Sequence, residues 1–134
     1  MAQLSGPIII TGCSSGIGRA TALRLLGSGH TVYATARSLD SLGELAAAGA
    51  HALALDVTDE DSMVAAVALV ERAHGAVAGL VNNAGYGEYG PVEEVSMERV
   101  RRQFETNVFG LARMIQLVLP AMRAAEDGIR DRLM

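Results

Sequence analysis

The chain of 134 residues contains no tryptophan, one cysteine and no lysine, since all eleven of its basic residues are arginine. The missing lysine excludes the G-x-x-x-x-G-K-[ST] loop by which many nucleoside triphosphatases hold phosphate. Cys13 alone can form no internal disulfide, and no spacing of cysteine and histidine resembles a metal site. The net charge is -4 and the arginines are scattered, so we expect no nucleic-acid partner.

Long apolar runs are also missing. The segment 1–7 has no charged leader, and its apolar stretch is too short for a signal peptide or a membrane span. We therefore expect a cytoplasmic protein without membrane contact. Hydrophobic residues make up 50% of the chain, which at this length suits one domain with a real core over residues 1–134.

A glycine-rich loop follows the first apolar run. The sequence T-G-C-S-S-G-I-G, residues 11–18, comes directly after three isoleucines. Gly12 lets the chain reverse, and Gly16 and Gly18 carry no Cβ that would block a ligand or strand from the start of the next helix. Because unpaired N–H groups and the helix dipole favour an anion there, the loop predicts a pyrophosphate site.

Short apolar runs alternate along the chain with segments of helical periodicity. We expect strands at 7–11, 31–35, 51–55 and 78–82. We expect helices at 17–26, 42–48 and 60–73, the last capped by Asp59, and a long helix that begins at Ser96. This pattern predicts an α/β fold with a Rossmann-like, doubly wound parallel sheet. The expected strand order is 3-2-1-4, with the ligand at the carboxyl ends of the first and fourth strands.

Two further motifs make the glycine loop specific. Asp56-Val57 follows the third apolar run, and Asn82-Asn83-Ala84-Gly85 ends the fourth. In this order and spacing, the three elements resemble the classical short-chain dehydrogenase/reductase family over roughly residues 8–123. The resemblance implies a dinucleotide cofactor, and we expect it to be bound by Gly12, Ser14, Ser15, Gly16, Ile17, Gly18, Arg37, Asp56, Val57, Asn83, Ala84 and Gly85.

The resemblance also implies roles for single residues. Asp56 would accept a hydrogen bond from the adenine amino group, or would only cap the loop before the third helix, and Val57 would pack against the adenine ring. Asn83 would tie neighbouring strands together beside the cofactor, while Ala84 and Gly85 leave room for it.

The end of the second strand indicates which dinucleotide is bound. An acidic residue there would accept hydrogen bonds from the adenosine ribose and select NAD. Ala36 occupies that position, and Arg37 follows with a guanidinium that suits the 2′-phosphate of NADP. We therefore expect NADP rather than NAD, the alternative being that Arg37 is a solvated loop cation.

The family's catalytic residues are almost entirely unmatched. No tyrosine is followed by lysine at the fourth position, and of the catalytic set only Asn107 has a counterpart, unless it is merely a polar kink residue in the fourth helix. We interpret the chain as the truncated, NADP-binding portion of an oxidoreductase that acts on a carbonyl or alcohol substrate when complete. The alternatives are a non-catalytic dinucleotide-binding or interaction module and a truncated chain without activity of its own, so whether it is an enzyme stays open.

The remaining predictions concern surfaces and ends. In the family the fourth and fifth helices form the dimer interface, so we expect homo-oligomers through Phe104, Val108, Leu111 and Ile115 of the fourth helix. The histidines, at 30, 51 and 74, are far apart in sequence and are expected to serve no site. The polar segment 124–134 resembles a frayed helix end more than a fifth strand.

Overall fold

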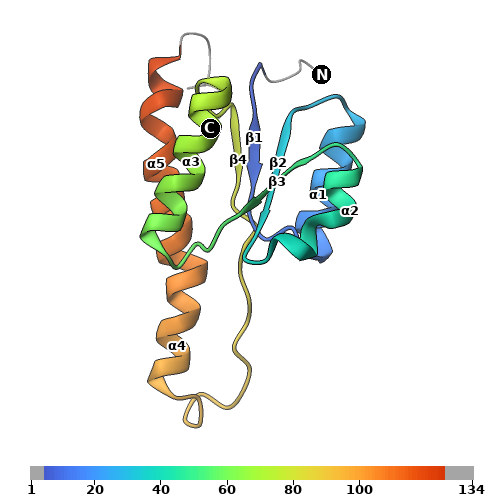
Figure 1. The fold of residues 1–134 in the computed structure, drawn as a ribbon. Helices are drawn as coiled ribbons and strands as arrows, with labels where there is room; N and C mark the ends of the chain where they lie inside the picture. Colours follow the sequence, from blue (N-terminus) through green and yellow to red (C-terminus); the bar gives the residue numbers. More distant parts are fainter. Residues whose placement is uncertain (1–4, 126–134) are drawn as a thin grey trace.

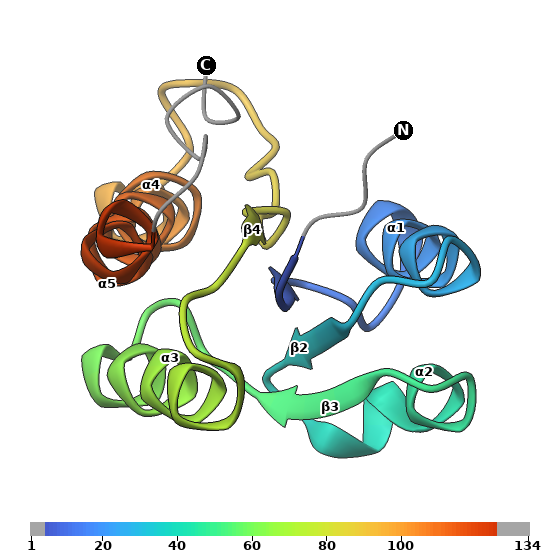
Figure 2. The ribbon, with the colours of Figure 1, turned by 90° about the horizontal axis from the view of Figure 1, so that it is seen from above.

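The computed structural model describes residues 5–125, so residues 126–134 of the predicted frayed helix end, 124–134, lie outside the described residues. A four-stranded parallel sheet lies between two layers of helices (Figures 1 and 2). The strands are β1 (Ile8–Ile10), β2 (Val32–Ala36), β3 (His51–Ala54) and β4 (Gly79–Val81). Their order in the sheet is β3-β2-β1-β4, which confirms the predicted Rossmann-like fold and its strand order.

Helices cover both faces of this sheet. They are α1 (Gly16–Gly27), the 3₁₀ turn η1 (Leu39–Leu42), α2 (Gly43–Ala47), α3 (Glu60–His74), α4 (Met97–Phe104), the π-helical segment η2 (Glu105–Gly110) and α5 (Leu111–Ala124). Figure 2 shows α1 and α2 on one face and α3, α4 and α5 on the other. Figure 1 shows α4 extending past the carboxyl ends of the strands.

The central strands are apolar apart from Thr35, whose hydroxyl donates to Ile10 O (2.9 Å), as expected where both faces of a strand are covered. Every residue of β1 and β2 is buried, whereas the outer strands β3 and β4 are only partly covered. Along β1 the side chains alternate between two cores: Ile9 packs with α3 and α5, and Ile8 and Ile10 pack with α1 and α2. Packing in these two cores fixes the positions of the carboxyl ends of the four strands relative to one another.

Two helix starts follow the predicted capping chemistry. Asp59 Oδ1 accepts a hydrogen bond from Ser62 N (3.2 Å) at the start of α3, and Ser96 Oγ accepts one from Arg99 N (3.2 Å) at the start of α4. Each bond satisfies an N–H group that would otherwise have no partner at a helix end.

The long helix predicted from Ser96 is interrupted by a wider turn. The π-helical segment η2 separates α4 from α5, although the three follow one another without a break. A Cβ at Gly110 would overlap the carbonyl oxygen of Val57, so the helix backbone lies directly against the loop after β3. This close approach depends on residues far apart in sequence, which is why helical periodicity did not predict the interruption.

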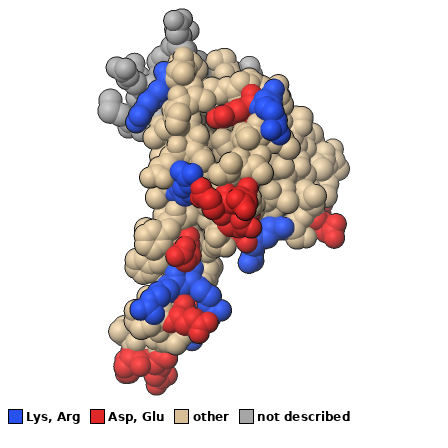
Figure 3. All heavy atoms as spheres, turned by 60° about the vertical axis from the view of Figure 1, so that its left-hand side comes forward, with Lys and Arg blue, Asp and Glu red and all other residues tan. Residues whose placement is uncertain are grey.

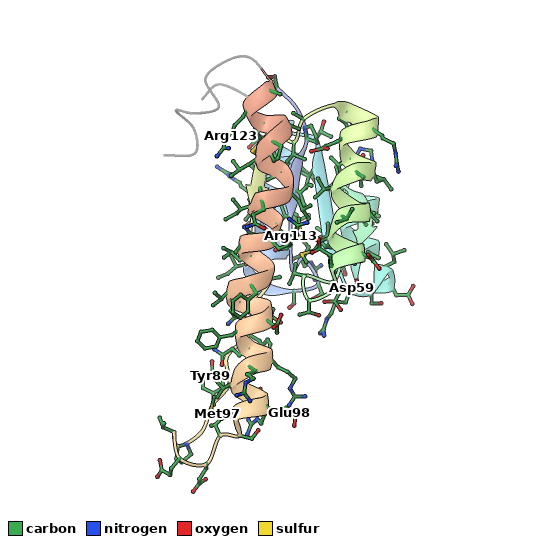
Figure 4. All side chains as sticks on the ribbon, turned by 90° about the vertical axis from the view of Figure 1, so that its left-hand side faces the viewer. Asp59, Tyr89, Met97, Glu98, Arg113 and Arg123 are labelled. Atoms are coloured by element: carbon green, nitrogen blue, oxygen red, sulfur yellow. The ribbon has the colours of Figure 1, made fainter. Side chains whose placement is uncertain are left out.

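The apolar stripe on this helix divides between core and surface. Val118 is buried with Met114 and Met122 in the core beneath α3 and α5. By contrast, Phe104 and Val108 are 49% and 44% exposed, and Leu111 and Ile115 are each 37% exposed. Figure 4 shows Met97 and Glu98 at the far end of α4, away from the sheet. The helix therefore presents an uncovered apolar face among the described residues.

Charged side chains gather along the same side of the molecule. Figure 3 shows arginines and acidic residues intermingled on this face, with the greatest density along the projecting end. Arg113 of α5 binds Glu60 of α3 through its Nη2 and Oε1 (2.6 Å), and Arg99 of α4 binds Glu88 (2.5 Å). The pairing of Arg113 and Arg99 with acids limits the positive potential on this face.

His51 and His74, far apart in sequence, meet around Tyr33 of β2. The Tyr33 ring stacks on His51 with centroids 4.6 Å apart, and its hydroxyl lies 2.9 Å from His74 Nε2. Tyr33 itself is buried, and the group lies where β3 begins and α3 ends. That is the end of the sheet opposite the carboxyl ends of its strands.

Removal of the Tyr33 hydroxyl should destabilise the fold modestly. Tyr33→Phe keeps the ring stack but leaves His74 without this partner, which should lower the free energy of unfolding by about 1 kcal/mol. Urea denaturation measures the difference. Tyr89→Phe, the same change at a side chain that is 86% exposed, serves as the control and should have no effect. Equal stabilities of Tyr33→Phe and the native chain would show that this bond contributes nothing.

Candidate cofactor-binding site

A cavity of about 670 Å³ opens at the carboxyl ends of the strands. It is lined by the glycine loop after β1, the end of β2, the loop after β3 and the segment after β4. Every residue predicted to bind cofactor lines it except Gly18. The cavity also takes in residues not predicted as binding residues: Thr11, Ala36, Leu55, Thr58, Tyr86 and Thr106.

The glycine loop brings the first helix close to the strands. Gly12 and Gly16 have φ of 69° and 59°, in the left-handed region that glycine adopts without strain. A Cβ at Gly12 would lie 2.8 Å from the Cα of Ala84, and one at Gly18 would overlap the Gly12 carbonyl and the Asn83 amide. Gly18 therefore packs α1 onto the sheet instead of lining the cavity.

The start of α1 suits an anion. Its N-cap residue, Ser15, has an extended backbone and makes no side-chain capping bond, unlike Asp59 at the start of α3. The first N–H groups of α1 therefore have no side-chain cap, and Ser14, Gly16 and Ile17 at this helix start line the cavity. A phosphate group is the natural partner for such a helix end.

Asn83 and Thr11 join the ends of β1 and β4. Asn83 Nδ2 donates to the carbonyl oxygens of Thr11 (3.1 Å) and Gly12 (2.9 Å). In return Thr11 Oγ1 accepts from Asn83 N (3.0 Å) and Ala84 N (2.9 Å). These four bonds fix the spacing of the two strands that flank the cavity, while the role of Asn83 beside a cofactor stays a prediction.

Asp56 and Arg37 lie on the side of the cavity formed by β2 and β3. Asp56 Oδ1 accepts hydrogen bonds from Thr58 Oγ1 (2.7 Å) and Thr58 N (2.9 Å). The Thr58 hydroxyl, and more weakly the Arg37 charge, hold the pKa of Asp56 below its ordinary value. The cavity therefore presents an ionised carboxylate beside a guanidinium.

Asn107 lies in η2 and holds the segment after β4 against the long helix. Its Oδ1 accepts from Tyr86 N (3.0 Å) and its Nδ2 donates to Tyr86 O (2.6 Å). A second attachment follows two residues later, where Glu88 N donates to Gln103 Oε1 (3.1 Å) and the Glu88 carboxylate binds Arg99. Asn107 does not line the cavity, so its contact with any reacting group stays a prediction.

Cys13 faces the core and not the cavity. The side chain is fully buried and its Sγ donates to Ile10 O (3.3 Å). Burial raises the pKa of the thiol, so it stays protonated and packs as a small residue.

The fold and the cavity together define a class of protein. A parallel sheet whose first strand runs through a glycine loop into a helix, with a cavity where the strand order reverses, is a dinucleotide-binding Rossmann-type fold. Residues 7–129 match the model of the short chain dehydrogenase family, and the chain belongs to that family. Members of this family bind NAD or NADP.

Individual relatives agree with this assignment. The chain is 40% identical over 122 residues to 3-ketodihydrosphingosine reductase of Bacteroides thetaiotaomicron, covering 90% of this chain and 44% of the relative. A short-chain dehydrogenase from Streptomyces avermitilis superposes with a TM-score of 0.87 at 40% identity, covering 92% of this chain and 46% of that one. A metagenomic short-chain oxidoreductase in complex with NADP superposes with a TM-score of 0.83 at 32% identity, covering 94% of this chain and 60% of that one.

The chain therefore spans less than half the length of the curated relative described above. Within residues 5–125, none of the helices has the length and apolar character needed to cross a membrane.

Proposed function

We propose that this chain binds NADP as the cofactor-binding part of an oxidoreductase that acts on a carbonyl or alcohol. The observation that carries the proposal is that Arg37 lines the same cavity as the uncapped start of α1, with Ala36 in place of an acid. A guanidinium recognises phosphate through paired hydrogen bonds, and no carboxylate at the end of β2 opposes the 2′-phosphate.

The other lining residues would contact different parts of the cofactor. The glycine loop and the first turn of α1 would hold the pyrophosphate. Asp56 would accept from the adenine amino group while Val57 packs against the ring, and Asn83, Ala84 and Gly85 would border the nicotinamide half. When bound, the cofactor supplies or accepts a hydride.

Chemical-shift mapping tests where the cofactor binds. Addition of NADP to isotope-labelled protein should shift the amide signals of Gly16, Ile17 and Val57, which border the cavity, and leave those of Ala73 and His74 at the far end of α3 in place. Absence of shifts at the glycine loop, or shifts confined to other surfaces, would contradict the proposed site.

A second candidate, a non-catalytic dinucleotide-binding module, is favoured by one observation. Asn107, the one residue with a counterpart in the family's catalytic set, does not line the cavity. Asn107 then serves only to hold Tyr86 in place. Oxidation of NADPH by the purified chain with any ketone, lost in Gly16→Val, would exclude this second candidate.

The exposed face of the long helix is proposed to mediate self-association of this one-domain unit. Phe104 and Val108 lie one helical turn apart and are both about half exposed. Phe104→Glu and Val108→Glu together should shift the oligomer to monomer, because charges would have to be buried at the contact. Light scattering measures the mass.

The matched control for this test is Val64→Glu, an exposed apolar position on α3. It adds one acid to a different helix and should leave the mass unchanged. A native chain that is monomeric at high concentration would show that this helix face does not mediate self-association.

A further inference from the structure

Asp56 is fixed in the cavity by a neighbour outside the family motif. Thr58 donates two hydrogen bonds to the same carboxylate oxygen, Oδ1, one from its hydroxyl (2.7 Å) and one from its backbone N–H (2.9 Å). Two donors on a single oxygen leave the carboxylate group little rotational freedom. No hydrogen bond to the other oxygen, Oδ2, occurs within residues 5–125, and both Asp56 and Thr58 line the cavity.

The backbone of Asp56 is held from the first turn of α3. Asp56 N donates to Ser62 Oγ (2.9 Å), while Ser62 N donates to Oδ1 of Asp59, the residue that caps the helix. Asp59 N in turn donates to Asp56 O (3.1 Å). The main chain of Asp56 is therefore anchored independently of Thr58, whose hydroxyl acts on the side chain alone.

We propose that Thr58 is a positioning residue for dinucleotide binding, which holds Asp56 Oδ1 so that Oδ2 faces the adenine amino group. This inference rests on the proposed function, since it assumes that Asp56 contacts adenine. Preorganisation would strengthen binding, because a carboxylate already held in one orientation loses less conformational freedom when the ligand binds.

The charge of Asp56 supports the same assignment. The Thr58 hydroxyl is the main reason that the pKa of Asp56 is lowered, and Arg37 at the end of β2 contributes in the same direction. The Asp59 carboxylate, the nearest acid along the chain, is engaged by Ser62 N. The bonds from Thr58 thus favour the ionised carboxylate, the form that accepts a hydrogen bond from an amino group, and also orient it.

The test compares NADPH with its hypoxanthine analogue, in which an oxygen replaces the adenine amino group. Thr58→Val removes the hydroxyl with little change of shape and keeps the backbone donor. We expect it to weaken NADPH binding by roughly threefold to tenfold and to leave binding of the analogue unchanged. Thr58→Ser restores the hydroxyl and should restore the affinity. Isothermal titration calorimetry gives each dissociation constant.

A merely structural role for Thr58 predicts a different result. Loss of local order would weaken the binding of NADPH and of the hypoxanthine analogue equally, so the effect would not depend on the amino group. A carboxyl NMR titration of the free protein gives a second readout, in which Thr58→Val should raise the pKa of Asp56.

Two outcomes separate this inference from the proposed function. If the native chain binds NADPH and Thr58→Val binds it equally well, the inference is overturned and the proposed function stands. If the native chain does not bind NADPH, both are overturned. A loss of affinity in Thr58→Val that is seen with NADPH and not with the hypoxanthine analogue, and that Thr58→Ser reverses, supports the inference.

Discussion

Replacement of Gly18 by alanine is expected to destabilise the fold by about 2–4 kcal/mol and to abolish dinucleotide binding. The added methyl group would overlap the Gly12 carbonyl oxygen and the Asn83 side-chain amide. The same amide makes the two bonds that tie Asn83 to the end of β1, so the methyl group cannot be accommodated without breaking them. Denaturant unfolding measures the loss of stability.

Gly27→Ala provides the matched control, because Gly27 lies in the same helix and a Cβ there would meet no atom within 4 Å. This variant should be as stable as the native chain or more stable by about 0.5–1 kcal/mol, the usual gain from alanine in a helix. If Gly18→Ala unfolds at the same denaturant concentration as Gly27→Ala, the close approach of α1 to the strands is not required for folding.

The second large effect is expected at Arg37. Arg37→Ala removes a charge-assisted contact, and we expect NADPH binding to weaken by about 1.5–3 kcal/mol while NADH binding stays unchanged. The reason is that only NADPH carries the 2′-phosphate that the guanidinium would recognise. Fluorescence of the bound reduced nicotinamide follows both titrations.

Arg24→Ala is the control for net charge, since Arg24 lies in the last turn of α1 and does not line the cavity. It should leave the affinity for NADPH nearly as in the native chain. Equal losses in the two variants would mean that Arg37 acts only through overall charge, as a solvated loop cation would.

Local patterns along the chain were sufficient to predict most of the fold. The buried central strands are visible in the sequence as short apolar runs. Asp59 and Ser96 cap their helices through hydrogen bonds to residues three positions further along the chain. The strand order followed from the right-handed rule for parallel connections together with the position of the glycine loop. Each of these features depends on neighbouring residues or on general geometric rules.

The features that were missed depend on contacts between distant segments. The π-helical segment forms where Gly110 lies against the Val57 carbonyl, and the grouping of Tyr33 with His51 and His74 joins two strands and a helix. Neither contact leaves a periodic signal in the sequence.

Most of the cavity lining could be predicted from the motifs where each strand ends, whereas cofactor binding by these residues stays a prediction. Thr58 was missed, although Asp side chains often accept a hydrogen bond from the backbone N–H two residues further on. That signal was present in the sequence, but only the structure shows that the turn opens into the cavity.

Whether Arg37 makes this site selective for NADP is best measured by calorimetric titration of the native chain with NADPH and with NADH at one ionic strength. We expect NADPH to bind more tightly than NADH, by about tenfold or more, because Arg37 borders the cavity and no acid stands at the end of β2. Equal affinities, a tighter NADH complex, or binding of neither dinucleotide would contradict it.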